Sequence, residues 1–257
     1  LDTPWGTPPR MEDLDRALTL HPEIEVVALV HHETTTGLLN PLKEVHALCQ
    51  QHDKRLLLDA VSSLGGEDLD FRETPVDFAA GTANKCLQGY PGVAFVLLKK
   101  SHLTRLAALP RRSVYFSLYD NWQAQEAGET LFTPAVQVHY ALDQALDELL
   151  EETVAGRVRR YRDAARRLRE GFRRMGLECL IPEERRSNTL TALRLPPGMT
   201  YPWLHDHLRG HGFVIYAGQG PLRQDIFRIA NMGDIRPGEF DRLLDVLEKC
   251  RTRAGNP

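Results

Sequence analysis

The chain has 257 residues, of which 42% are hydrophobic and 26% are charged, and its formal net charge at pH 7 is −3. This composition is typical of a globular protein with one large domain, or with one domain and a smaller second one. The balanced charge argues against nucleic-acid binding, and no apolar run approaches the roughly 20 residues of a membrane-spanning helix. Four widely spaced cysteines without a C-x-x-C pair indicate neither a disulfide framework nor a zinc site, and they fit a reducing cytoplasm.

Apolar, strand-like segments alternate with helical ones in the first part of the chain. The pattern predicts helices at 9–20 and 40–53, and strands at 25–33, 55–61, 76–83 and 92–100. Asn40 is the expected N-cap of the second helix, with Pro41 at its first helical position. Continuous apolar strands that alternate with helices predict an α/β fold with a mostly parallel sheet.

The later part of the chain reads as a smaller α+β block. Helical periodicity covers 134–174 and Gly176 is the expected stop, followed by strands at 188–196, 213–218 and 225–231 and by helices at 201–212 and 239–250. We place the boundary near 150–160, which divides the chain into a large domain, 1–155, and a small domain, 156–257. The Arg-rich stretch 157–174 has a helical core face, so most of its arginines are expected on a solvated face.

Polar residues follow three of the predicted strands, in HHETTTG, DAVSS and TANK. The carboxyl ends of parallel strands meet at one edge of a sheet, which is where ligands bind in such folds. Asp59 ends one strand and Lys85 follows the next. Alone, Asp59 could be a capping or loop residue and Lys85 a surface lysine.

Together, an aspartate and a lysine at adjacent strand ends fit pyridoxal phosphate chemistry. A lysine amine can form a Schiff base with the cofactor's aldehyde. An aspartate can hold the pyridine nitrogen protonated, so that the ring accepts electrons from a substrate carbanion. Asp59 and Lys85 are therefore the central candidate pair.

The motifs VHHETTTGLLNPL, LLLDAVSSLGG and GTANKCLQGYPGVAFVLLKK, in this order, resemble those of the class V aminotransferases. The similarity extends over nearly the whole chain. It implies fold type I of the pyridoxal phosphate enzymes, with a large domain that is incomplete here. HHETTTGLLNP and GFVIYAGQG…FRIANMGDI are most similar to the branch that moves an amino group from 2-aminoethylphosphonate to pyruvate, giving phosphonoacetaldehyde and L-alanine in phosphonate catabolism.

The resemblance implies a role for each matching cofactor residue. Lys85 would carry the cofactor and move a proton between the substrate and C4′. Asp59 would pair with the pyridine nitrogen and Val61 would pack on one face of the ring. Thr34 would lie near the phenolic oxygen, and Asn84 would reach the phosphate.

Two further implied roles concern the partner subunit and the substrate. QEAGETLFTPAVQ resembles the segment that crosses to a neighbouring subunit, so Thr133 would bind the partner's cofactor phosphate in a homodimer with shared sites. Arg228 would bind the acid group of an amine or 2-oxo acid substrate, since its planar fork suits a carboxylate.

The family also has a Gly/Ser/Thr-rich segment that supplies most of the N–H donors to the phosphate, and an aromatic ring that stacks on the cofactor. No such segment precedes Glu33. We therefore expect a family member that lacks its N-terminal part, with weak cofactor binding and little activity if the chain is complete.

Other functions remain open. The chain could be a different class V transaminase that uses glyoxylate with alanine or serine, or a non-catalytic remnant of the fold. HHE at 31–33 and HDH at 205–207 lack matching partners, so we predict no metal site. Cys86 is expected to be a small buried residue rather than a nucleophile, and GQG at 218–220 could border the substrate pocket.

Overall fold

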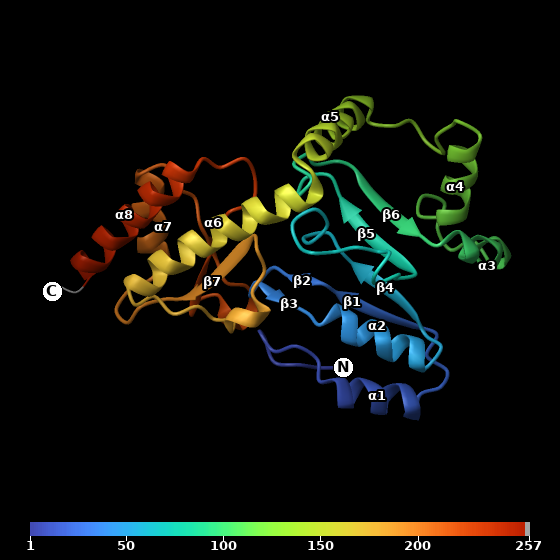
Figure 1. Cartoon of the computed structure of the whole chain (residues 1–257), viewed down its shortest axis with the longest axis horizontal. Coiled ribbons are helices and arrows are strands. Elements are labelled where there is room, and N and C mark those ends of the chain that lie inside the picture. Colours follow the sequence, from blue (N-terminus) through green and yellow to red (C-terminus); the bar gives the residue numbers. More distant parts are fainter. Residues whose placement is uncertain (255–257) are drawn as a thin grey trace.

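The computed structural model describes residues 1–254. Figure 1 shows two groups of helices and strands joined by one long helix, α6 (Val154–Arg174). The first sheet has the order β1-β4-β5-β6 and the second has the order β7-β9-β8. Both the α/β class and the mostly parallel first sheet agree with the sequence-based prediction.

The first group is built around the first sheet. Its elements are α1 (Met11–Leu20), β1 (Val26–Val30), β2 (His32–Glu33), β3 (Leu38–Leu39), α2 (Leu42–Gln51), β4 (Arg55–Asp59), β5 (Phe78–Thr82) and β6 (Ala94–Leu98). β1, β4 and β5 are parallel, whereas β6 pairs antiparallel with β5 at the edge. Helices α1 and α2 pack on one face through a core that includes Leu18, Val45, Leu56 and Leu58.

A series of helical elements leads from the first sheet to α6. A 3₁₀ turn (Lys100–His102), α3 (Leu103–Ala108), α4 (Leu118–Glu126) and α5 (Val136–Glu152) lead into α6. The predicted helical stretch 134–174 is therefore two helices, broken at Thr153, whose φ is 67°. Gly176 follows α6 with a φ of 69°, which confirms the predicted stop.

The second group surrounds the antiparallel sheet. It contains 3₁₀ turns at Glu183–Arg185 and Gly220–Leu222, with β7 (Leu190–Arg194), α7 (Tyr201–Gly210), β8 (Tyr216–Ala217), β9 (Ile226–Ala230) and α8 (Pro237–Ala254). Helices α6, α7 and α8 contribute to one buried core with β7 and β9, in which Phe172, Leu193 and Phe227 are fully buried. The residues predicted to form the core face of α6 are buried: Val158, Tyr161, Ala165, Leu168 and Phe172.

One local prediction is wrong. Asn40 does not cap α2, because Pro41 occupies the N-cap position and no side chain caps the helix. The Asn40 amide instead donates to the Val30 carbonyl at 2.8 Å. It therefore satisfies the carbonyl at the end of β1, ten residues earlier, which the helix-capping pattern does not reveal.

Candidate active site at the carboxyl edge of the first sheet

The carboxyl ends of β1, β4 and β5 meet at one edge of the first sheet. Val30 pairs with Asp59 on the neighbouring parallel strand, and Asp59 pairs with Ala80 on the next. The loop that carries Lys85 leaves β5 from this edge after Thr82. The sheet register therefore brings together strand ends that are far apart in the sequence.

Asp59 is half-buried and held in place by its own turn. Its Oδ1 accepts a hydrogen bond from Val61 N at 2.9 Å, and its main-chain oxygen accepts one from His31 N at 3.0 Å. Oδ2 makes no hydrogen bond to any residue in the described part of the chain. The carboxylate is thus oriented, and one of its oxygens is available to a donor from outside the chain.

Lys85 is half-buried on a tight loop. The main chain of this loop is closed by bonds from Gln88 N to Lys85 O at 2.9 Å and from Gly89 N to Ala83 O at 2.8 Å. Within residues 1–254 the Lys85 ammonium has neither a hydrogen bond nor an ion pair. Asn84, its neighbour, is exposed, and its Oδ1 accepts from Thr82 Oγ1 at 2.8 Å. The backbone around the lysine is therefore fixed while its amine stays available.

Two buried histidines, His31 and His32, precede Glu33, and His32 lies near Lys85. His32 Nδ1 donates to the Ser62 carbonyl at 3.1 Å, which leaves Nε2 as an acceptor. His32 Nε2 and His31 Nδ1 are buried and have no hydrogen-bond partner in the described part of the chain. Burial lowers the pKa of each to about 4, and for His32 the nearby Lys85 charge adds to this effect. A pKa of about 4 leaves both rings neutral at pH 7, so His32 adds no positive charge near Lys85.

Glu33 shapes the loop that follows the histidines. Its carboxylate accepts from Thr35 N at 2.5 Å, from Thr36 N at 3.0 Å and from Thr36 Oγ1 at 2.6 Å. Thr35 Oγ1 then donates to Gln219 Oε1 at 3.0 Å. The GQG turn of the second group therefore lies against this loop, at the edge of the candidate site.

Arg228 reaches the same loop from β9. It is half-buried, with Nε donating to Ala217 O at 2.8 Å and Nη1 donating to Thr34 O at 2.9 Å. Burial lowers the pKa of the guanidinium, and the Glu33 charge opposes that shift. Nη2 makes no hydrogen bond within residues 1–254, so one edge of the guanidinium is available to an acid group.

Comparison with known proteins assigns the family. The sequence profile of the aminotransferase class-V family matches residues 7–200. The chain is a class V aminotransferase family member. Members of this family typically depend on pyridoxal phosphate.

Individual relatives agree with this assignment. The chain is 41% identical over 249 residues to the 2-aminoethylphosphonate–pyruvate transaminase of Aeromonas hydrophila, covering 95% of this chain and 65% of that protein. It is 40% identical to the enzyme of the same name from Bacteroides fragilis, covering 92% and 66%. The fold matches alanine–glyoxylate aminotransferase from Nostoc sp. with a TM-score of 0.89 and 28% identity, covering 97% of this chain and 67% of the other. The chain thus spans about two thirds of the length of these relatives.

The structure brings together only part of the predicted set. Asp59 bonds Val61, and Arg228 bonds Thr34, but the latter through the threonine carbonyl. Thr133 is exposed between α4 and α5, and it makes no hydrogen bond to the other candidates in the described chain. Its proposed position in a partner subunit's site remains a prediction.

The sequence-based prediction placed HHETTTG at this edge of the sheet but gave neither histidine a role beside Lys85. The available signal was a pair of polar residues directly after the strand β1. No group of three or more His, Cys, Asp or Glu side chains in the described residues could hold a metal ion. None of the helices described here is both long and apolar enough to cross a membrane.

Proposed function

We propose that this chain is a pyridoxal phosphate-dependent aminotransferase that acts on 2-aminoethylphosphonate and pyruvate. The amino group of the donor and the carbonyl oxygen of the acceptor exchange places, giving phosphonoacetaldehyde and L-alanine. The observation that carries the proposal is the half-buried Lys85, whose amine has no partner among residues 1–254, at the sheet edge that also holds Asp59. The choice of substrates is supported by about 40% identity to two proteins of that name.

The residues at the edge fit the cofactor chemically. Within the described residues, Asp59 Oδ2 has no partner and could accept from the pyridine N–H, and the Lys85 amine has none and could bond the aldehyde carbon. Val61 would pack on the ring, Thr34 would lie near the phenolic oxygen, and Asn84 would reach the phosphate. Pyridoxal phosphate would supply the electron sink that stabilises a carbanion at the substrate carbon.

Lys85 has two chemical tasks in this proposal. Its Nζ would hold the cofactor covalently at the aldehyde carbon, with the aldehyde oxygen released as water. The same Nζ, once released by the incoming amine, would take a proton from the substrate carbon and return it at the cofactor's C4′. A short, closed loop suits both tasks because it limits where Nζ can move.

Arg228 would bind the acid group of the substrate. Two of its nitrogens already donate to carbonyls, which fixes the plane of the guanidinium. The second N–H of Nη1 and an N–H of Nη2 would then form two parallel donors to a carboxylate or phosphonate of the substrate. A fixed plane lowers the entropy lost when the substrate binds.

The proposal includes an assembly. Thr133 would donate to the cofactor phosphate of the other subunit in a homodimer with shared sites. A large domain at 1–155 and a small domain at 156–257 would contribute Lys85 and Arg228, respectively, to one site.

The test is covalent trapping followed by substrate exchange. Purified protein is mixed with pyridoxal phosphate, reduced with borohydride and mapped by mass spectrometry. We expect the label on Lys85, with none at that position in Lys85→Ala and no change in the control Lys100→Ala, whose lysine is exposed. Unselective labelling of the exposed lysines alone would overturn the cofactor assignment.

Substrate choice is then tested with the loaded protein. 2-Aminoethylphosphonate should discharge the visible absorbance of the cofactor-loaded protein that has not been treated with borohydride, and L-serine should not. The likeness to an alanine–glyoxylate aminotransferase makes a glyoxylate enzyme the second candidate. Discharge by alanine or serine with glyoxylate as acceptor, and not by the phosphonate, would favour that candidate.

A further inference from the structure

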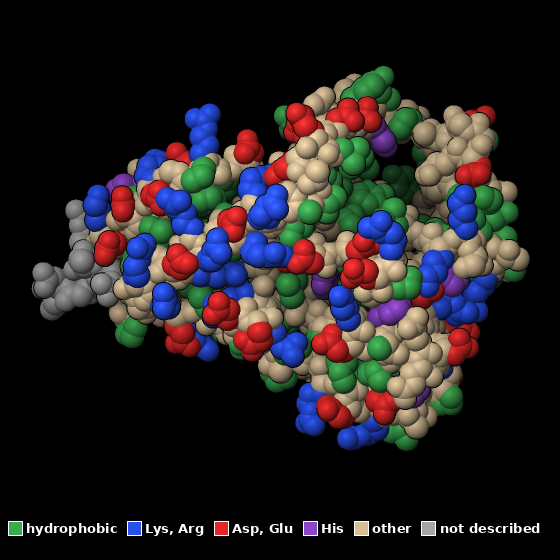
Figure 2. All heavy atoms as spheres, in the orientation of Figure 1, with side chains coloured by type: hydrophobic (Ala, Val, Ile, Leu, Met, Phe, Trp, Pro, Cys, Tyr) green, Lys and Arg blue, Asp and Glu red, His purple; other side chains and the backbone are tan. Residues whose placement is uncertain are grey.

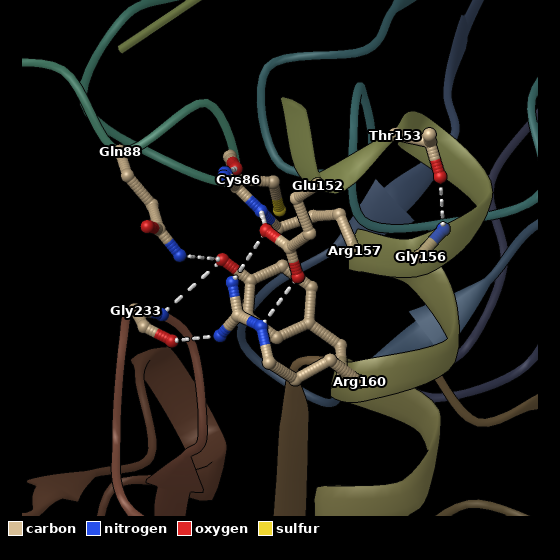
Figure 3. A network of polar contacts seen from close by, with 9 residues as sticks. Cys86, Gln88, Glu152, Thr153, Gly156, Arg157, Arg160 and Gly233 are labelled. Atoms are coloured by element: carbon tan, nitrogen blue, oxygen red, sulfur yellow. Dashed lines mark hydrogen bonds and ion pairs between the residues drawn. The ribbon is translucent and has the colours of Figure 1, made fainter. Parts of the chain in front are cut away.

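The junction of α5 and α6 contacts the loop that carries Lys85 (Figure 3). Thr153 breaks the two helices with a φ of 67°, and its Oγ1 accepts from Gly156 N at 3.0 Å. The break places Glu152 beside the first turn of α6. There its carboxylate binds both Arg157 and Arg160.

Arg157 is an exception among the arginines of α6, most of which are exposed or only partly buried. It is 2% exposed. Its Nε donates to Glu152, and its Nη1 donates to the Cys86 carbonyl at 3.0 Å. Burial of a guanidinium is unfavourable unless its donors are paired. Here one of the paired groups is the carbonyl of the residue directly after Lys85.

The next turn of α6 adds a second attachment. The Tyr161 hydroxyl accepts from Gln88 Nε2 at 2.6 Å and from Gly233 N at 3.3 Å. Gln88 N closes the turn onto the Lys85 carbonyl. Arg160 Nη1 donates to the Gly233 carbonyl at 2.7 Å. One end of α6 therefore holds both the Lys85 loop and the segment that follows β9, the strand of Arg228.

We propose that Arg157, with Glu152 as its counter-ion, is a positioning residue for Lys85. The inference rests on the proposed function, because Arg157 acts through the backbone at Cys86 rather than on the cofactor or substrate. A lysine side chain is flexible, so its reach is set by where the main chain lies. A displacement of about 1 Å near reacting atoms can slow a reaction roughly 100-fold, and a charge-assisted bond to Cys86 O resists that displacement.

The first experiment measures the loop without any cofactor. Hydrogen–deuterium exchange is followed in the wild type, in Arg157→Gln, and in the control Arg159→Gln, whose arginine is exposed on the same helix. We expect faster exchange of the Gln88 and Gly89 amides in Arg157→Gln only. Unchanged exchange there, or a uniform increase over the whole chain, would overturn the positioning role.

The second experiment measures the rate at which pyridoxal phosphate and borohydride label Lys85, relative to exposed Lys100, in proteins shown to be folded by circular dichroism. We expect Arg157→Gln to lower this ratio roughly 10- to 100-fold. Arg157→Lys should restore part of it, since it keeps the charge but not the fork. An unchanged ratio in a folded Arg157→Gln protein contradicts the proposal.

Two further measurements cover the cases in which Arg157→Gln does not fold or Lys85 is not labelled selectively. If Arg157→Gln does not fold, Glu152→Gln removes the counter-ion but keeps the arginine, and it is expected to change the same two readouts in the same direction. If wild-type Lys85 is labelled no faster than Lys100, the proposed function fails. Hydrogen–deuterium exchange at the Gln88 and Gly89 amides then still decides whether Arg157 fixes the loop that carries Lys85.

Discussion

The two sheets of this protein differ in how they are covered. On the second sheet, Leu193 and Phe227 are fully buried beneath helices α6, α7 and α8. On the first sheet, α1 and α2 cover one face, while Val26, Val30 and Leu57 on the other face are 42%, 43% and 39% exposed. Figure 2 shows hydrophobic side chains gathered in a hollow beneath α5, on the same side of the molecule as the first sheet.

The region with the larger core is therefore not the region that holds the candidate catalytic residues. The second group has the larger continuous core, whereas Asp59 and Lys85 lie at the edge of the partly covered sheet. The site is completed from both groups, through Arg228 on Thr34 and through α6 on the Lys85 loop. Damage to the second core should therefore affect the whole molecule, and changes on the open face should have little effect.

The largest expected effect is in the second core. Phe172→Ala removes a fully buried ring packed among the three helices and the sheet. We expect a loss of about 3–5 kcal/mol in the free energy of unfolding, from lost burial and the cavity left behind. Urea denaturation followed by circular dichroism measures this. A loss below about 1 kcal/mol would show that this core does not dominate stability.

A matched pair of substitutions on β4 tests the first sheet. Leu58 is fully buried and Leu57, its neighbour on the opposite face, is 39% exposed. Leu58→Ala should cost about 2–5 kcal/mol, and Leu57→Ala less than about 1 kcal/mol. Equal losses would mean that the open face is covered in solution, and the comparison between the two sheets would then fail.

Arg228→Gln tests the contribution of the second group to the site. The change removes the charge from the donor edge that we assign to the substrate acid. The loss of a hydrogen bond to a charged group, about 1.5–3 kcal/mol, corresponds to roughly a 10- to 150-fold fall in kcat/KM for the 2-oxo acid. Arg223→Gln, an exposed position in the same group, is the control. Equal kcat/KM values for the two variants would remove Arg228 from the site.

A further expected effect is a pH dependence at the contact between the two groups. Glu67 is buried, and its Oε1 accepts from Asn188 N at 2.6 Å. Burial raises its pKa to about 8 from 4.5, although Asn188, Arg169 and Arg162 act in the opposite direction and Asp68 adds to the shift. A carboxyl whose pKa is higher in the folded state stabilises the protein most below pH 4.5, and this stabilisation is lost as pH rises to about 8.

Glu67→Gln should therefore flatten the dependence of unfolding free energy on pH between about 5 and 8. The measurement is a series of urea denaturation curves across that range. Glu126→Gln, at an exposed position on α4, should leave the wild-type slope intact. An identical slope in Glu67→Gln would show that this carboxyl ionises in the folded protein without a penalty.

Much of the fold could be predicted from the sequence because local periodicity determines it. The four strands of the first sheet, the helices around them and the stop at Gly176 follow from apolar spacing and glycine. The antiparallel direction of β6 and the role of Asn40 do not, because both depend on pairings that form only when the sheet is assembled.

The candidate site likewise has residues that could be predicted from the sequence and contacts that could not. The sequence determined that an aspartate and a lysine follow neighbouring strands and that an arginine lies on a later one, since strand ends and residue types are local facts. Only the tertiary structure decided that Arg157 bonds the carbonyl next to Lys85 across 71 positions, and that Arg228 bonds Thr34 across 194. A buried polar group takes whichever partner the packing places within reach, and that packing depends on how the whole chain folds.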